Sequence, residues 1–128
     1  MSLRDSLEIL VVDDTSVSRG LICMSLEEIG FKKVDFCKNA EEAFAIATRK
    51  GVHLIISDQN MPGMTGIQLL EKLRCNKSTA RLGFILVSGS MTPQILQQAR
   101  KLGLNNFLSK PFDTPKLKAC VQTVTGPL

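Results

Sequence analysis

The chain has 128 residues, of which 44% are hydrophobic and 22% are charged, and its formal net charge is +4. This length suffices for a core that folds without disulfides, and we expect one domain over residues 1–128 with its core within about 7–125. No apolar run approaches the roughly 18 residues of a membrane span. Residues 1–10 also lack the long apolar region of a signal peptide, so the sequence predicts neither membrane insertion nor export.

The four cysteines do not form a metal-binding or redox motif. They stand at Cys23, Cys37, Cys75 and Cys120, and none of the gaps between them matches a metal knuckle or a CxxC pair. Free, reduced thiols are typical of proteins in the cytoplasm. We therefore expect a cytoplasmic protein.

The first predicted elements are a strand and a helix. Residues 8–12, EILVV, form a short β-branched run that predicts a strand. Thr15 or Ser16 can cap a following helix, and Gly30 suits its end. Apolar residues occupy two rows of that helix, one at Val17, Leu21 and Met24 and the other at Ile22, Leu26 and Ile29.

The alternation continues to the end of the chain. Further strands are expected at 33–37, 53–57, 84–88 and 105–109, and further helices at 39–51, 67–76, 93–103 and from the cap at Thr114-Pro115 onwards. Five strands alternating with five helices predict an α/β fold, in which helices cover both faces of a parallel sheet.

Charged and hydroxyl side chains stand where the predicted strands end. Asp13 and Asp14 follow the first strand and Asp58 the third, while Ser88 ends the fourth and Lys110 follows the fifth. The carboxyl ends of parallel strands share one edge of the sheet, where α/β folds build their sites. Any one of these residues could merely terminate a strand, but their convergence indicates a site.

The chemistry of that edge suits a phosphoryl group and a hard cation. Three carboxylates without histidine or thiolate favour Mg²⁺, or Mn²⁺, over zinc. The ammonium of Lys110 and the hydroxyl of Ser88 can hold phosphoryl oxygens. Asp58, alone at the end of the central strand, is then the candidate nucleophile for an aspartyl phosphate.

These residues resemble a known family. The acidic pair after ILVV, Asp58 within LIISDQNMPGMTG, Ser88 within FILVSG, Phe107, and the KPF at 110–112 resemble the receiver domains of two-component response regulators, in particular the stand-alone, chemotaxis-type (CheY-like) members. The resemblance covers essentially the whole chain. It implies a flavodoxin-like, doubly wound sheet of five parallel strands in the order 2-1-3-4-5.

The resemblance also implies roles for the site residues. Asp58 would accept a phosphoryl group from a sensor histidine kinase or a phosphotransfer protein. Mg²⁺ would be held by the side chains of Asp14 and Asp58 and the backbone carbonyl of Asn60, with Asp13 acting mainly through water. Such a domain is a signalling phospho-acceptor and not an enzyme, apart from its own phosphorylation and dephosphorylation.

Three further features carry over from the family. Lys110 would pair with the phosphoryl group, and the Lys110–Pro111 peptide bond would be cis. Ser88 and Phe107 match the switch pair, in which a hydroxyl moves toward the phosphoryl group and an aromatic ring turns inward behind it. This chain has Ser where Thr is commoner and Phe where Tyr is often found.

The second half of the chain is basic. Residues 72–128 contain nine Lys or Arg and one Asp, which gives a net charge of +8. Residues 1–71 contain seven Lys or Arg and eleven Asp or Glu, which gives −4. The docking face for a downstream protein is expected on the fourth helix, fifth strand and fifth helix, around Gln94, Gln97, Lys101 and Lys116. A solvated basic face is the alternative, and no motif indicates direct binding of nucleic acid.

Other functions remain open. The chain can be the receiver part of a larger DNA-binding transcriptional regulator. It can also be a Mg²⁺-dependent phosphotransferase or phosphatase with an aspartate nucleophile, although SDQN at 57–60 lacks the second aspartate usual in such enzymes. The leading hypothesis is a phospho-accepting response regulator of a two-component, chemotaxis-type phosphorelay.

Overall fold

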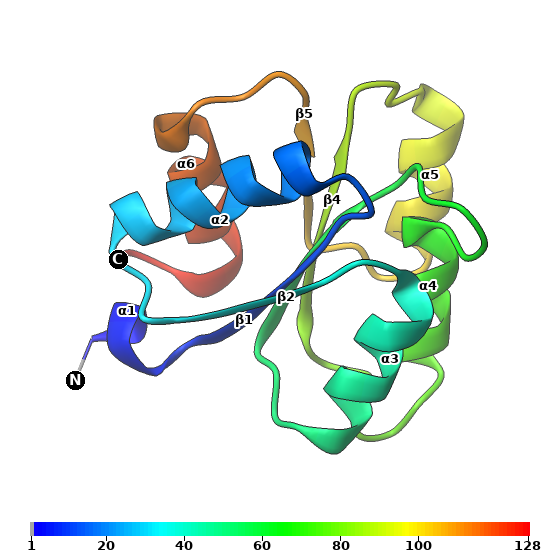
Figure 1. The fold of residues 1–128 in the computed structure, drawn as a ribbon. Coiled ribbons are helices and arrows are strands. Elements are labelled where there is room, and N and C mark those ends of the chain that lie inside the picture. Colours follow the sequence, from blue (N-terminus) through cyan, green and yellow to red (C-terminus); the bar gives the residue numbers. More distant parts are fainter. Residues whose placement is uncertain (1) are drawn as a thin grey trace.

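The computed structural model describes residues 2–128 and shows an α/β fold (Figure 1). Its strands are β1 (Glu8–Val12), β2 (Lys33–Cys37), β3 (Leu54–Asp58), β4 (Gly83–Ser88) and β5 (Asn106–Ser109). Its helices are α1 (Leu3–Ser6), α2 (Ser16–Ile29), α3 (Ala40–Arg49), α4 (Gly66–Arg74), α5 (Pro93–Lys101) and α6 (Thr114–Thr125).

The five strands form one parallel sheet in the order β2-β1-β3-β4-β5, as the resemblance implies. Helices α2 and α6 cover one face of the sheet, and α3, α4 and α5 cover the other (Figure 1). Alternate residues of each central strand therefore enter different cores: Ile55 contributes to the core under α3–α5, and Ile56 to the core under α2 and α6. Burial on both faces explains why β3 is apolar without alternation.

The register of the sheet brings the strand ends together. Val12 of β1 pairs with Ser57 of β3, and Asp58 pairs with Val87 of β4. Ser88 in turn pairs with Ser109 of β5. The residues that end or follow these strands consequently meet at one edge of the sheet, which we call the mouth.

Two local features differ from the sequence expectations. A short helix, α1, precedes the first strand, where none was predicted. The cap of α6 is Asp113, whose side chain accepts the N–H of Lys116, and not Thr114. The hydroxyl of Thr114 instead donates to α2, at Ser25 Oγ and Glu28 Oε2, because tertiary partners compete with local capping.

Only one of the two apolar rows of α2 is buried. Ile22, Leu26 and Ile29 pack into the core, whereas Val17, Leu21 and Met24 are exposed, Val17 by 71%. A helix on the outside of a sheet buries one stripe, so an amphipathic pattern with a second row leaves that row at the surface. None of the helices in residues 2–128 has both the length and the apolar composition to cross a membrane.

Matched truncations on α2 test this orientation. Leu26 is fully buried, whereas Leu21 is 56% exposed. Leu26→Ala should lower the free energy of unfolding by about 2–5 kcal/mol, because it leaves a cavity in the core. Leu21→Ala should change it by no more than about 0.5 kcal/mol. Urea unfolding measures both, and equal losses in the two variants would contradict the orientation of α2.

Candidate functional site

Three carboxylates meet at the mouth. Asp13 and Asp14 lie after β1, and Asp58 is the last residue of β3. One oxygen from each of the three lies within 4.8 Å of the others. Asp13 is 0% exposed and Asp58 6%, whereas Asp14 is exposed. Two of the three charges are therefore largely removed from water.

Backbone hydrogen bonds hold Asp13 in place. Its Oδ1 accepts the N–H of Thr15 at 3.0 Å, and its own N–H donates to the carbonyl of Cys37. The guanidinium of Arg19 donates to the Asp13 carbonyl at 3.1 Å, and it also lies over the ring of Phe36. Arg19 was not among the predicted site residues, since an arginine in an exposed helix turn carries no signal of its own.

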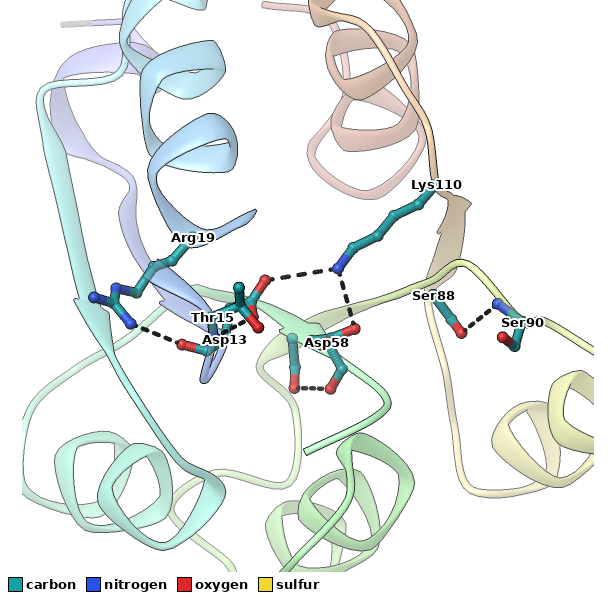
Figure 2. A network of polar contacts seen from close by, with 8 residues as sticks. Asp13, Thr15, Arg19, Asp58, Ser88, Ser90 and Lys110 are labelled. Atoms are coloured by element: carbon teal, nitrogen blue, oxygen red, sulfur yellow. Dashed lines mark hydrogen bonds and ion pairs between the residues drawn. The ribbon is translucent and has the colours of Figure 1, made fainter. Parts of the chain in front are cut away.

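Lys110 supplies the positive charge of the site. Its Nζ lies 3.7 Å from Asp13 Oδ2 and 3.5 Å from Asp58 Oδ1, between the two carboxylates (Figure 2). Charge-assisted hydrogen bonds are usually about 2.7–2.9 Å long, so neither contact is a short one. The backbone N–H of Lys110 donates to the carbonyl of Ser88, which fixes β5 to β4 here. The Lys110–Pro111 peptide bond is cis.

The charge balance at Asp58 changes its acidity. Burial raises the pKa of the Asp58 carboxyl above its ordinary value and is the largest cause. The ammonium of Lys110 lowers that pKa, and the carboxylate of Asp13 raises it again. The net result is a raised pKa, so one lysine does not offset the burial of two carboxylates.

The donor set fits a hard divalent cation. Within residues 2–128, Asp13 Oδ2 is buried and accepts no hydrogen bond. A buried oxygen that accepts no hydrogen bond and lies beside two further carboxylates is suited to bind a cation, or a water molecule that is itself bound to a cation. All three groups offer oxygen, and neither histidine nor cysteine belongs to the cluster. This set favours Mg²⁺ or Mn²⁺ over zinc.

Ser88 is turned away from the carboxylates. Its hydroxyl is almost fully buried and its Oγ accepts the N–H of Ser90 at 3.0 Å (Figure 2). Ser90 was not predicted as part of the site, because only the fold of the loop after β4 shows this bond. Phe107 of β5 is half-buried and packs on the core under α3–α5. It pairs with Leu86, two residues before Ser88 on β4.

The remaining predicted residues are exposed. Asn60 is exposed in the loop after β3. Gln94, Gln97 and Lys101 are exposed on α5, and Lys116 is exposed on the first turn of α6. The four residues on α5 and α6 are available at the surface, as a docking face requires.

Comparison with known proteins identifies the family. The family model of the response regulator receiver domain matches residues 9–122. The probable chemotaxis protein CheY of Rhizobium etli is 38% identical over 128 residues, which are 100% of this chain and 99% of that protein. The similarity therefore extends along the whole of both sequences.

Two solved structures of known proteins have a fold similar to that of this chain. Vibrio cholerae chemotaxis protein CheY4 superposes with a TM-score of 0.86 at 28% identity, over 92% of this chain and 98% of that one. The receiver domain of a sensor histidine kinase from Pseudomonas aeruginosa, which has a magnesium ion coordinated in its active site cleft, gives a TM-score of 0.84 over 94% and 98%. Because the two sequences are 24% identical, this second match shows similarity of fold alone.

The raised pKa of Asp58 predicts a pH-dependent gain of stability in Asp58→Asn. A carboxyl that holds its proton more tightly when folded stabilises the protein at low pH, and this contribution is lost as pH rises through the folded pKa. Without divalent cations, Asp58→Asn should thus be more stable than wild type at neutral pH. The difference should shrink as the pH falls through the raised pKa.

Urea unfolding across this pH range measures the effect. Asp14→Asn is the matched control, because Asp14 is exposed and its removal should change stability less. A gain for Asp58→Asn that grows on acidification would contradict the charge balance described above.

Proposed function

We propose a function for this chain from the family to which it belongs, the response regulator receiver domains. It is a CheY-like receiver domain, and the relative that matches its full length is named a chemotaxis protein. We infer that it is a phospho-accepting regulator of a two-component, chemotaxis-type phosphorelay. In this proposal a sensor histidine kinase or a phosphotransfer protein phosphorylates Asp58, and a partner protein reads the result.

The observation that carries the proposal is the position of Asp58. Its carboxylate is buried at the mouth, 3.5 Å from the Lys110 ammonium and beside two further carboxylates. In the transfer, an oxygen of Asp58 forms a bond to phosphorus while the P–N bond to the donor's imidazole breaks. The imidazole nitrogen keeps the electron pair. Lys110 stabilises the negative charge of the transferred group.

The carboxylates provide the cation site that this chemistry requires. Asp14 and Asp58 would hold Mg²⁺ by their side chains, Asn60 by its backbone carbonyl, and Asp13 mainly through water. The ion supplies positive charge that offsets the carboxylates and the phosphoryl oxygens. Mn²⁺ has the same preference for oxygen and can replace it.

The chain acts in this proposal as a phospho-acceptor and not as an enzyme with a separate substrate. The only reactions expected of it are its own phosphorylation and dephosphorylation. We also propose that it works in the cytoplasm, which the four free cysteines support.

In this proposal, phosphorylation of Asp58 affects the docking face through changes in side-chain packing, because direct charge effects are screened over about 8–10 Å in physiological salt. We propose that the Ser88 hydroxyl leaves the N–H of Ser90 for a phosphoryl oxygen. Ser88 and Leu86 point to the same side of β4, and Phe107 pairs with Leu86. A displaced Ser88 thus leaves room that the Phe107 ring can enter.

The movement of Phe107 would reach the surface through α5. Phe107 and Ile95 pack on the same core. The exposed residues of α5 and α6 nearby, Gln94, Gln97, Lys101 and Lys116, form the proposed docking face. Its two lysines favour a partner with an acidic or amphipathic segment.

Phosphorylation can be tested on the isolated chain. Acetyl phosphate with Mg²⁺ should add the mass of one phosphoryl group to wild type and none to Asp58→Asn, as measured by intact-protein mass spectrometry. Asp14→Asn should stay folded yet lose the modification, because the cation site loses a ligand. Equal modification of wild type and Asp58→Asn would show that Asp58 is not the acceptor.

The switch is tested by Phe107→Ala. Beryllofluoride with Mg²⁺, a phosphoryl analogue, should shift the amide resonances of residues 92–118 in wild type. In Phe107→Ala the shifts at Gln94, Gln97 and Lys101 should shrink, whereas the shift at Ser88 persists. Phe44→Ala is the control, since Phe44 packs on the same core from α3. Unaltered shifts in Phe107→Ala would contradict the pathway.

A further inference from the structure

Gln59, the residue after Asp58, is unusually well anchored. It is 8% exposed although it begins a loop. Its backbone N–H donates to the carbonyl of Val87 on β4 at 2.9 Å. Its backbone carbonyl accepts the N–H of Gly66 at 3.1 Å, and its side-chain Oε1 accepts the N–H of Ile67 at 2.8 Å. One residue thereby joins the end of β3 to β4 and to α4.

The hydrogen bonds at the start of α4 show how much depends on Gln59. A helix begins with four N–H groups that lack helical partners. In α4 these are the N–H groups of the cap Thr65 and of residues 66–68, and Gln59 accepts two of them, from Gly66 and Ile67. The other two are satisfied by a capping box: Thr65 Oγ1 accepts the N–H of Gln68 at 3.3 Å, and Gln68 Oε1 accepts the N–H of Thr65 at 2.8 Å. Gln59 therefore satisfies half of the helix start, and among the acceptors described within residues 2–128 it is the one that links this start to the end of β3.

Steric contact makes this junction tight. A Cβ atom at Gly66 would lie 2.6 Å from the carbonyl oxygen of Asp58 and 2.7 Å from Leu86 Cδ1. Real Cβ atoms do not come so close to other atoms. The first residue of α4 is consequently pressed against the backbone of the candidate phospho-acceptor, and glycine is required there.

We propose that Gln59 is a positioning residue of the cation site, holding the peptide of Asn60 ready for Mg²⁺. This inference rests on the proposed function, in which the Asn60 carbonyl is a cation ligand. Asn60 follows directly after Gln59 and opens the loop 60–65. The hydrogen bonds that the N–H groups of Gly66 and Ile67 donate to Gln59 close that loop at its base. A fixed base limits the freedom of the adjoining carbonyl, as outer groups commonly do for metal ligands.

The test is a pair of matched substitutions at the start of α4. Gln59→Met keeps a side chain of similar length and removes the acceptor of the Ile67 N–H. It should weaken binding of Mg²⁺ alone to the unphosphorylated protein by about tenfold. Amide chemical shifts during titration with MgCl₂ measure this affinity. Hydrogen exchange at the Ile67 amide should also become faster.

The control is Gln68→Met. Gln68 is exposed, and its Oε1 accepts the N–H of Thr65 at 2.8 Å, so it supports the start of the same helix. It makes no bond to β3. Its substitution should leave Mg²⁺ affinity within about twofold of wild type and the exchange at Ile67 unchanged. Equal losses of Mg²⁺ affinity in both variants would overturn the proposal, because helix stability would then explain them.

Gln59→Glu covers the case in which Gln59→Met fails to fold. It keeps an oxygen acceptor for the Ile67 N–H, so Mg²⁺ affinity should equal or exceed that of wild type. A loss as large as that expected for Gln59→Met would overturn the inference. If wild type binds Mg²⁺ and Gln59→Met binds it equally well, only this inference fails. If wild type shows no Mg²⁺-dependent shifts around Asp14 and Asp58, the proposed cation site fails with it.

Discussion

The site depends on two buried carboxylates that share a single ammonium. Asp13 and Asp58 are almost inaccessible to water, and Lys110 lies 3.7 and 3.5 Å from them. Burying a charge without full compensation costs free energy, which the two hydrophobic cores of the sheet must offset. At Asp58, burial raises the pKa of the carboxyl by more than the ammonium of Lys110 lowers it. A proton or a divalent cation would reduce the cost of burying these carboxylates.

The surrounding backbone keeps the charges together. The N–H of Thr15 and the guanidinium of Arg19 bond to Asp13, while Gln59 ties the end of β3 to α4. These contacts oppose the mutual repulsion that would otherwise move the carboxylates apart. They also connect the mouth to α2 and α4 by packed, hydrogen-bonded structure, so a change of charge there can alter the elements around it. Ser88 and Ser90 form a corresponding connection toward α5.

Much of this arrangement was predictable. Apolar runs identified β1, β3 and β4, the alternation with helix signals identified β2 and β5, and the strand ends then placed Asp13, Asp58, Ser88 and Lys110 on one edge. The capping box of α4, formed by Thr65 and Gln68, was not predicted, although these residues have its spacing. The role of Gln59 was not predicted either, because a glutamine in a loop near proline and glycine gives no sign that its side chain is buried and hydrogen-bonded. Its partner, the N–H of Ile67, is eight residues away.

The sequence by itself determined the order of the elements, the parallel sheet and the kinds of side chain at its edge, because hydrophobic period and helix-end residues are local properties. Only the tertiary structure decided which row of α2 is buried, that Asp113 and not Thr114 caps α6, and that one lysine contacts both buried carboxylates. Those outcomes depend on competition between partners far apart in the chain. Lys110 and Asp58, for instance, are separated by 52 positions. Such competition is resolved by packing, so local patterns do not reveal it.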